Sequence, residues 1–309
     1  PPGFHKELDE EKIPEYLSYE YIPYENTIFK NVFKLPGAHC FTYKDGKLNV
    51  ERYYRIQYSI EEDKPLEYWE EAIQKEFSES VAMHQIADVE VGCFLSSGVD
   101  SSYVACSAHV DKTFTVGFDN GTKYNEISYA QELSEQIPVK NISHIITPEE
   151  FWGNFGKIQY HMDEPQSNLS SVPLYYLAQM ASKEVTVVLS GEGADELFAG
   201  YEWYEDTPEM RTFKKRVPLG VRRALGSLVQ HLPYFKGHNF LTKCAEVPER
   251  WYVGQAKVFD PSEVDEVLKP AYDTGKNAAE MCAEYYKQVP NCCELSKKQY
   301  LDMNMWLPG

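Results

Sequence analysis

The sequence lacks any apolar run near the roughly 20 residues that a membrane-spanning helix requires. It also lacks an export signal, because its opening stretch, PPGFHKELDEEK, is neither apolar nor basic. We therefore expect neither a membrane span nor secretion, and we place the protein in the cytoplasm. The length of 309 residues predicts one or two domains.

Basic residues are few compared with acidic ones. The chain has 30 Lys and Arg against 48 Asp and Glu, which gives a formal net charge of −18. A surface this acidic repels phosphate backbones and anionic lipids, so nucleic acids and membrane surfaces are not expected partners. The net charge does not exclude a local pocket that binds a small anion.

The seven cysteines are an odd number in a chain that is not small, which does not favour a disulfide framework. Cys292 and Cys293 are adjacent, but no second cysteine pair or nearby pair of histidines completes a zinc-binding pattern. Cys93 and Cys106 lie in apolar stretches typical of a core. We expect reduced thiols in a reducing compartment.

Strands and helices alternate between residues 65 and 204. The expected strands cover residues 89–95, 113–118, 142–147 and 185–189. The expected helices cover residues 65–86, 126–136, 148–162 and 173–183, with a further one that follows the first strand and ends at 108. Apolar strands that alternate with helices predict an α/β fold, in which a parallel twisted sheet has helices on both faces. After residue 204 the strand signals fade, and the C-terminal part is expected to be helical.

The opening segment precedes this pattern. Residues 9–22 are expected to form a helix, and residues 39–54 a hairpin with Asp45-Gly46 as its turn. We interpret residues 1–60 as an approach segment that is not a self-sufficient domain. Residues 61–309 then form the main domain.

A loop rich in small residues follows the first strand: FLSSGVDSS, residues 94–102. Small side chains let backbone N–H groups approach an anion, and the N-terminus of the next helix favours negative charge at the same place. The loop lacks the lysine of a Walker A motif, so a metal or a distant lysine would have to neutralise the anion. Asp100 is placed to bind magnesium. The plainer alternative is that Ser96 and Asp100 only cap a helix.

A second such loop follows the last strand: SGEGADE, residues 190–196. It is not a dinucleotide fingerprint, because Glu196 stands where a third glycine is expected. Asp195 is a candidate second metal ligand. Glu192, between two glycines, is a candidate for proton transfer. The alternative is an acidic turn that caps a helix.

Together the two loops point to a family. FLSSGVDSS resembles the pyrophosphate loop, SGGxDS, of ATP α-hydrolases that adenylate a substrate. LSGEGADELFAGY resembles the second signature of the asparagine synthetase B family. Two further stretches match that family, YLSYEYIPYENTIFKNVFKLPGAHC and MDEPQSNLSSVPLYYLA, so the resemblance covers nearly the whole chain.

The resemblance implies an adenine nucleotide α-hydrolase-like fold and the C-terminal synthetase region of a glutamine-dependent asparagine synthetase, a glutamine amidotransferase. Such an enzyme is an AMP-forming carbon–nitrogen ligase of asparagine biosynthesis. It activates the β-carboxylate of aspartate with ATP and Mg²⁺, and ammonia from a glutaminase domain then displaces AMP. A homodimer is left open.

The same resemblance assigns residues by motif. Those assigned to ATP and its pyrophosphate are Phe94, Ser96, Ser97, Gly98, Asp100, Ser101, Val116, Ser190 and Gly191. Phe94 and Val116, at the ends of the first two strands, would flank the nucleoside. Asp100 and Asp195 are the implied magnesium ligands, and Asp100 is also counted as catalytic. Glu192 is the candidate base that takes a proton from the attacking ammonia.

Three departures from the family pattern limit this assignment. Ser97 stands where the family usually has glycine. The chain begins with Pro1 instead of a catalytic cysteine, and Cys40 lies in the hairpin, so glutamine hydrolysis is not assigned to it. The chain also stops at LPG, ahead of a family segment whose lysine contacts the phosphates. We expect a fragment truncated at its C-terminus that binds nucleotide and turns over poorly.

Proteins with other functions also carry these two loops. Relatives close β-lactams, macrocyclise peptides or amidate other carboxylates, and the aspartate pocket cannot be read from spacing. A nucleotide-binding fragment without turnover is a second class. A tRNA-modifying relative is disfavoured by the −18 charge and by the absence of a zinc knuckle or basic domain.

Overall fold

The computed structural model describes residues 3–59, 64–118, 125–165, 167–233, 235–259, 261–269, 272 and 278–308. The chain divides into two compact units. One unit is Ser59–Ala194, and the other joins Pro1–Tyr58 to Asp195–Gly309. The division therefore does not follow the order of the sequence, since the second unit takes both ends of the chain.

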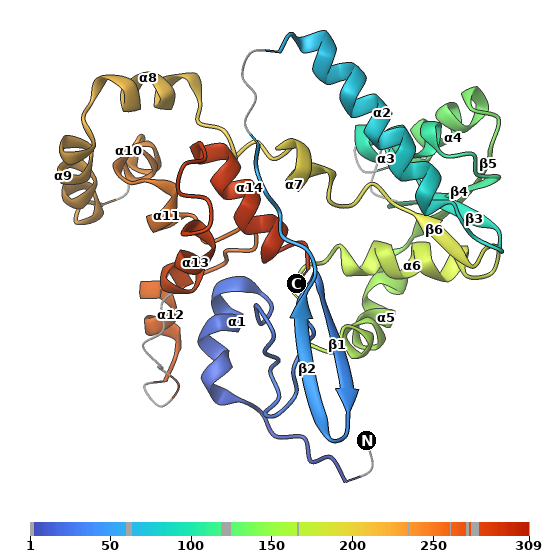
Figure 1. The fold of residues 1–309 in the computed structure, drawn as a ribbon, viewed down its shortest axis with the longest axis horizontal. Helices are drawn as coiled ribbons and strands as arrows, with labels where there is room; N and C mark the ends of the chain where they lie inside the picture. Colours follow the sequence, from blue (N-terminus) through green and yellow to red (C-terminus); the bar gives the residue numbers. More distant parts are fainter. Residues whose placement is uncertain are drawn as a thin grey trace. The chain divides into compact units, whose positions relative to one another are not determined.

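The unit of residues 59–194 is built on a four-stranded parallel sheet (Figure 1). Its strands are β3 (Val91–Phe94), β4 (Lys112–Phe118), β5 (Lys140–Ile146) and β6 (Val187–Leu189). Its helices are α2 (Leu66–His84), α3 (Val99–Ser107), α4 (Ile127–Gln136), α5 (Pro148–His161) and α6 (Ser171–Ala181). The predicted α/β fold with a parallel sheet is confirmed, element by element.

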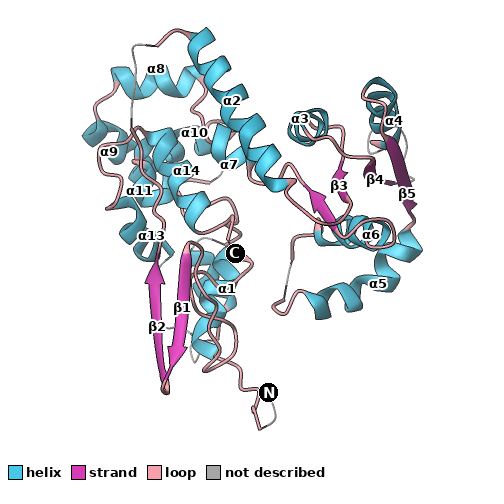
Figure 2. Ribbon diagram, turned by 45° about the vertical axis from the view of Figure 1, so that its right-hand side comes forward, coloured by secondary structure: helices cyan, strands magenta, loops and turns pink. Residues whose placement is uncertain are grey.

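Helices cover both faces of this sheet (Figure 2). On one face, α2, α3 and α4 pack on the strands through a buried cluster of Val81, Cys93, Leu95, Val104, Ala105, Ala108, Val110, Ala130 and Leu189. On the other face, α5 and α6 pack through Ile146, Ile158, Val172 and Tyr176. Because both faces are covered, β3 and β6 are apolar, with the sequences VGCF and VVL, whereas β5, KNISHII, carries polar residues.

The order of the strands marks a reversal in the sheet. The spatial order is β5-β4-β3-β6, so the chain crosses from β3 to β5 in one direction and then returns to place β6 on the other side of β3. In open parallel sheets, ligands bind outside the carboxyl ends of the strands at such a reversal. The loops that follow β3 and β6 both leave the sheet at that point.

The other unit contains a hairpin and a set of helices. The hairpin strands are β1 (His39–Lys44) and β2 (Lys47–Arg52), and Asp45 and Gly46 between them have φ of 51° and 74°, as a two-residue hairpin turn requires. Ahead of the hairpin lie η1 (Glu10–Lys12) and α1 (Ile13–Tyr19). The later helices are α7 (Ala194–Phe198), α8 (Pro208–Arg216), α9 (Leu219–Gln230), α10 (His238–Ala245), α11 (Pro248–Trp251), α12 (Pro261–Val267), α13 (Ala278–Tyr286) and α14 (Glu294–Asn304).

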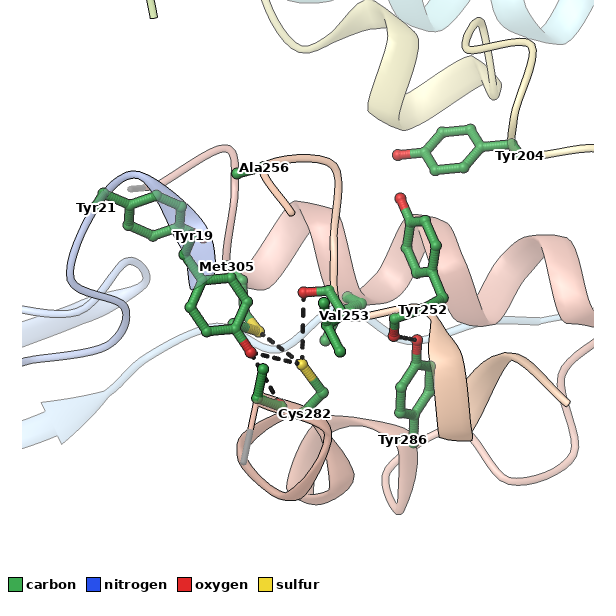
Figure 3. Packing of buried hydrophobic residues seen from close by; sticks show 11 residues of the cluster. Tyr19, Tyr21, Tyr204, Tyr252, Val253, Ala256, Cys282, Tyr286 and Met305 are labelled. Atoms are coloured by element: carbon green, nitrogen blue, oxygen red, sulfur yellow. Dashed lines mark hydrogen bonds between the residues drawn. The ribbon is translucent and has the colours of Figure 1, made fainter. Parts of the chain in front are cut away.

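The core of this unit joins the opening segment to the C-terminal helices (Figure 3). The Tyr19 hydroxyl donates to the backbone oxygen of Ala278 at 2.9 Å, and it lies 3.3 Å from the Cys282 sulfur. The Tyr286 hydroxyl donates to the backbone oxygen of Tyr252 at 2.7 Å. Tyrosine rings fill this core, and their hydroxyls find acceptors, which a buried polar group needs.

The predicted helix, hairpin and helical C-terminal part of this unit are confirmed. The division into an approach segment, 1–60, and a synthetase domain, 61–309, stays a prediction, because residues 60 and 61 lie outside the described residues. What the structure adds is that the first 58 residues pack with residues 195–309. Along the described parts of the chain, no helix is long and apolar enough to cross a membrane.

Candidate nucleotide site

The first small-residue loop begins where β3 ends, at Phe94. The Leu95 backbone N–H donates to the Phe114 oxygen at 2.9 Å, and the Thr115 hydroxyl donates to the Leu95 oxygen at 2.8 Å. These bonds tie the start of the loop to β4. Leu95 itself is buried between sheet and helices, so the loop leaves the sheet from a fixed point.

Hydroxyl groups shape the loop from within. The Ser96 and Ser101 hydroxyl oxygens lie 2.8 Å apart, and the Ser96 N–H donates to the Ser101 hydroxyl at 3.1 Å. The Gly98 N–H donates to the Ser96 hydroxyl at 3.1 Å. The loop is thus closed on itself before any ligand binds, and small side chains are the ones that fit this closure.

Helix α3 starts directly after the loop with an open N-terminus. Gly98 is the residue before the helix, and it has no side chain that could cap the first turn of α3. The first N–H groups of a helix have no partner inside the helix, so those of α3 are available to an anion. The Ser96 hydroxyl bonds to Gly98 ahead of the helix, and the residue at the cap position of α3 is Gly98.

The second loop lies against the start of α3. A Cβ placed on Gly191 would lie 2.8 Å from the Ser101 nitrogen and 3.0 Å from the Asp100 carbonyl carbon, which is closer than side-chain carbons approach backbone. Only glycine allows this approach. The loops after β3 and β6 therefore meet at the start of α3.

Glu192 projects from this second loop. Its backbone N–H donates to the Ser190 hydroxyl at 3.2 Å, and Gly193 after it has φ of 87°, in the left-handed region that favours glycine. The Glu192 side chain is exposed. The two flanking glycines thus serve different ends: Gly191 permits close packing, and Gly193 permits the turn into α7.

Asp100 offers an exposed carboxylate in the first turn of α3. Among the described residues, no three or more His, Cys, Asp or Glu side chains gather so as to hold a metal ion by themselves. Asp195 belongs to the other compact unit, where its carboxylate lies over Gly200. The joint use of Asp100 and Asp195 for one magnesium ion stays a prediction.

The two residues predicted to flank a nucleoside lie on neighbouring strands. Phe94 is the last residue of β3, as predicted. Val116 is not at the end of β4, which continues for two more residues because it pairs with β5 as far as Phe118 and Ile146. Val116 is half-buried and packs towards the cluster under α5 and α6. Its place at a strand end is the one positional prediction for this site that needs correction.

The sequence reasoning missed Glu126. Its carboxylate accepts a hydrogen bond from the Ser97 hydroxyl at 3.2 Å, and it directly precedes α4. The same rule that singled out the other loops, a polar residue between a strand and the next helix, could have found it. Ser97, which departs from the family pattern, therefore has a partner within this chain.

The site carries negative charge and no positive charge of its own. None of residues 96–101 and 190–193 is Lys, Arg or His, whereas Asp100, Glu192 and the adjoining Glu126 are acidic. A phosphate-bearing ligand would add to this charge. Its binding needs a cation, either a metal bound with the ligand or a basic residue from elsewhere.

Comparisons with known proteins agree on one family. Residues 72–309 match the asparagine synthase family. An asparagine synthetase (glutamine-hydrolysing) of Bacillus subtilis is 34% identical over 98% of this chain and 48% of its own length. A putative asparagine synthetase (glutamine-hydrolysing) of Mycobacterium tuberculosis is 32% identical over 99% of this chain and 48% of its own length. The chain spans about half the length of these curated relatives.

A comparison of structures finds a glutamine-dependent NAD⁺ synthetase from Acinetobacter baumannii in complex with ADP. The match covers 93% of this chain and 62% of that one, with 13% sequence identity and a TM-score of 0.31. A score this low does not establish a common arrangement of elements. Membership of a family therefore rests on the sequences.

Proposed function

Because this chain belongs to the asparagine synthase family, we propose that it is the synthetase part of a glutamine-hydrolysing asparagine synthetase. The whole protein would be a carbon–nitrogen ligase that consumes ATP and releases AMP. Aspartate and ammonia are the proposed co-substrates, and a glutaminase part would supply the ammonia.

The proposed reaction has two steps. A β-carboxylate oxygen of aspartate attacks the α-phosphorus of ATP, the bond from that phosphorus to the bridging oxygen breaks, and pyrophosphate leaves from β-aspartyl-AMP. The nitrogen of ammonia then attacks the β-carbonyl carbon, and a base takes one proton. The bond from that carbon to the AMP oxygen breaks, which gives asparagine and AMP.

The observation that carries this proposal is the contact of Gly191 with the first turn of α3. It places the loop that carries Glu192 beside the loop that carries Asp100, at the reversal of the sheet. One loop offers helix N–H groups to a pyrophosphate. The other brings a carboxylate close to the same place, so one site can serve both nucleotide activation and proton transfer.

The residues fit a magnesium ion that arrives with ATP. Such an ion takes one or two protein carboxylates and completes its coordination with phosphate oxygens and water, and the exposed Asp100 carboxylate can be one of those ligands. When bound, it would supply the positive charge that the loops lack. The N–H groups of α3 would orient the pyrophosphate.

Glu192 is the proposed base for the second step. Its carboxylate is exposed at the site, and its backbone is held by Ser190 and by the turn at Gly193. A proton-transfer group must reach the nitrogen that attacks, and positioned acid–base groups contribute roughly a hundredfold to ten-thousandfold in rate. The base therefore matters for asparagine formation and not for adenylation.

Two substitutions in the full-length protein separate the steps. Asp100→Asn should lower aspartate-dependent exchange of pyrophosphate into ATP by about a hundredfold or more. Glu192→Gln should keep this exchange and lose asparagine formation. Glu132→Gln, at an exposed glutamate of α4, is the matched control and should leave both reactions as in the unchanged protein. Undiminished exchange in Asp100→Asn, or normal asparagine formation in Glu192→Gln, would remove that residue from its proposed role.

A further inference from the structure

Helix α7 carries Asp195 but is only five residues long, Ala194–Phe198. A helix this short is not stable by itself, because the cost of its first turn is not recovered over so few hydrogen bonds. Contacts with the rest of its unit must therefore hold it. These contacts decide where the Asp195 carboxylate points.

Gln299 of α14 provides the contacts at the end of α7. Its side-chain amide nitrogen donates to the backbone oxygens of Glu196 and Leu197, each at 3.0 Å. The last carbonyl groups of a helix have no partner within it, and this single amide satisfies two of them. Gln299 is buried, with 9% of its surface exposed, so water does not compete easily for these bonds.

The turn that closes α7 also holds Asp195. Ala199 has φ of 57°, a left-handed conformation that costs a non-glycine residue energy. This conformation lets the Gly200 N–H donate to the Asp195 backbone oxygen at 2.9 Å. A Cβ on Gly200 would lie 2.0 Å from the Asp195 carboxylate oxygen Oδ1, so the carboxylate rests on this glycine.

Two neighbours of Gln299 on α14 fix the chain just after this turn. The Lys298 ammonium group donates to the backbone oxygens of Trp203 and Tyr204 at 3.2 and 2.9 Å. Asp302 accepts from the Tyr204 hydroxyl at 2.7 Å. Lys298 and Asp302 are 2% and 0% exposed, and buried groups of this kind are costly unless they are bonded as these are.

We propose that Gln299 is a positioning residue: by capping α7 it aims the carboxylate of Asp195. The proposal rests on the function proposed above and on the role that the sequence resemblance implies for Asp195, a ligand of the magnesium ion bound with ATP. Gln299 lies more than a hundred residues from the loop SGEGADE, and its side chain bonds to backbone oxygens of α7. No local sequence pattern around Gln299 or Asp195 predicts that Gln299 holds the helix that carries Asp195.

The test compares two glutamines in the full-length protein. Gln299→Met keeps the size of the side chain and removes both donors. Gln288→Met is the matched control, because the Gln288 side chain bonds to the Tyr300 hydroxyl of the same α14 at 3.0 Å and makes no bond with α7. For each variant we would measure hydrogen exchange of the amides of residues 195–200 and the Mg²⁺ concentration for half-maximal pyrophosphate exchange.

Gln299→Met should speed amide exchange in residues 195–200 and raise the half-maximal Mg²⁺ concentration about tenfold, the size expected from the loss of one or two hydrogen bonds. The KM for aspartate should change little. Gln288→Met should alter neither quantity. Gln299→Asn keeps the amide but has a shorter side chain, so it should show the same two changes to a smaller extent. It replaces Gln299→Met in the experiment if that variant does not fold.

Equal behaviour of the Gln299 and Gln288 variants in both measurements would overturn the proposal. So would faster amide exchange without any change in Mg²⁺ dependence, because α7 would then be loosened without consequence for the metal. If the unchanged protein showed no metal-dependent reaction with ATP, the proposed function would fail instead. Hydrogen exchange would still decide whether Gln299 holds α7.

Discussion

Among single residues, the Asp302 carboxyl group is shielded completely from solvent, with 0% exposure. It accepts hydrogen bonds from the hydroxyls of Tyr204 and Tyr252 and from the Gln255 backbone N–H. Figure 3 shows the hydroxyl ends of the two tyrosines turned towards one another. Burial raises the pKa of Asp302 from its ordinary value of 3.8 to about 6, although these three bonds act to lower it.

This raised pKa predicts a pH dependence of stability. Between pH 3.8 and about 6 the folded protein holds the Asp302 proton more tightly than the unfolded chain does. The contribution of Asp302 to stability is therefore greatest at low pH, falls as pH rises through this window and then stays constant. The total fall is on the order of 2–3 kcal/mol.

Urea unfolding of the unchanged protein and of Asp302→Asn, from pH 4 to pH 7, checks this prediction. The unfolding free energy of the unchanged protein minus that of the variant should decline by the stated amount across the window. Subtracting the variant cancels the other carboxyl groups, whose contributions differ in sign. Parallel pH profiles would show that Asp302 does not titrate as described.

At the same scale, the sequence predicted where the two small-residue loops lie better than which side chains contact them. It singled out Asp100, Glu192 and the glycines around them, because small residues after apolar strands form a recognisable pattern. It did not predict Glu126 as the partner of Ser97. That contact joins residues 29 positions apart, and side-chain contacts over such distances leave no periodic trace in the sequence.

At the scale of elements, α5 begins with a complete capping box. The Thr147 hydroxyl accepts from the Glu150 N–H at 3.2 Å, and the Thr147 N–H donates to the Glu150 carboxylate at 3.0 Å. This second bond is the leading reason that the pKa of Glu150 lies below its ordinary value. Helix α8 begins with the same Thr-Pro-Glu sequence, and the Thr207 hydroxyl accepts from the Met210 N–H at 3.3 Å. Met210 stands at the position that Glu150 holds in α5, so no carboxylate at that position returns a bond to the Thr207 N–H.

The comparison predicts a cost for each kind of capping bond. Thr147→Ala and Thr207→Ala each remove one capping hydroxyl and should each lower the unfolding free energy of their unit by about 1 kcal/mol. Glu150→Ala removes instead the bond from the Thr147 backbone N–H, which Thr147→Ala leaves in place, and should cost about 0.5–1 kcal/mol. Hydrogen exchange of the amides in each helix reports the losses in α5 and α8 separately. A Glu150→Ala variant as stable as the unchanged protein would mean that the Glu150 bond contributes nothing measurable.

The elements from residue 65 to residue 204 were predictable because each is long or strongly patterned. The helix expected at 65–86 covers Leu66–His84, and the strand expected at 185–189 covers Val187–Leu189. The later helices were predictable only as a helical region. Helices α10, α11 and α12 have 8, 4 and 7 residues, too few turns for an apolar repeat to mark their ends.

At the scale of the whole molecule, the grouping of the chain was not predictable from local patterns. Taken alone, the sequence of residues 1–60 is that of a segment that leads into a domain. In the structure it shares a core with the last helices, and the bond from Tyr19 to Ala278 spans 259 positions. Contacts this distant depend on the packing of complete elements, which composition and periodicity do not specify.

The arrangement of the sheet was predictable in part. Alternating strands and helices predicted a parallel sheet, and the meeting of the loops after its first and last strands follows from the order β5-β4-β3-β6. The close approach of Gly191 to Asp100 and Ser101 is not predictable from the sequence and is seen only in the structure. The sequence could propose a shared site, but a backbone distance was needed to bring Glu192 to the loop that holds Asp100.

The most direct measurement follows the oxygen atoms of aspartate. The full-length protein would be given ATP, Mg²⁺, ammonium and aspartate labelled with ¹⁸O in its β-carboxylate, and the products analysed by mass spectrometry. We predict that AMP is released with one ¹⁸O at its phosphorus and that pyrophosphate is unlabelled. Release of ADP with ¹⁸O in inorganic phosphate would contradict the adenylation of aspartate on which the account depends.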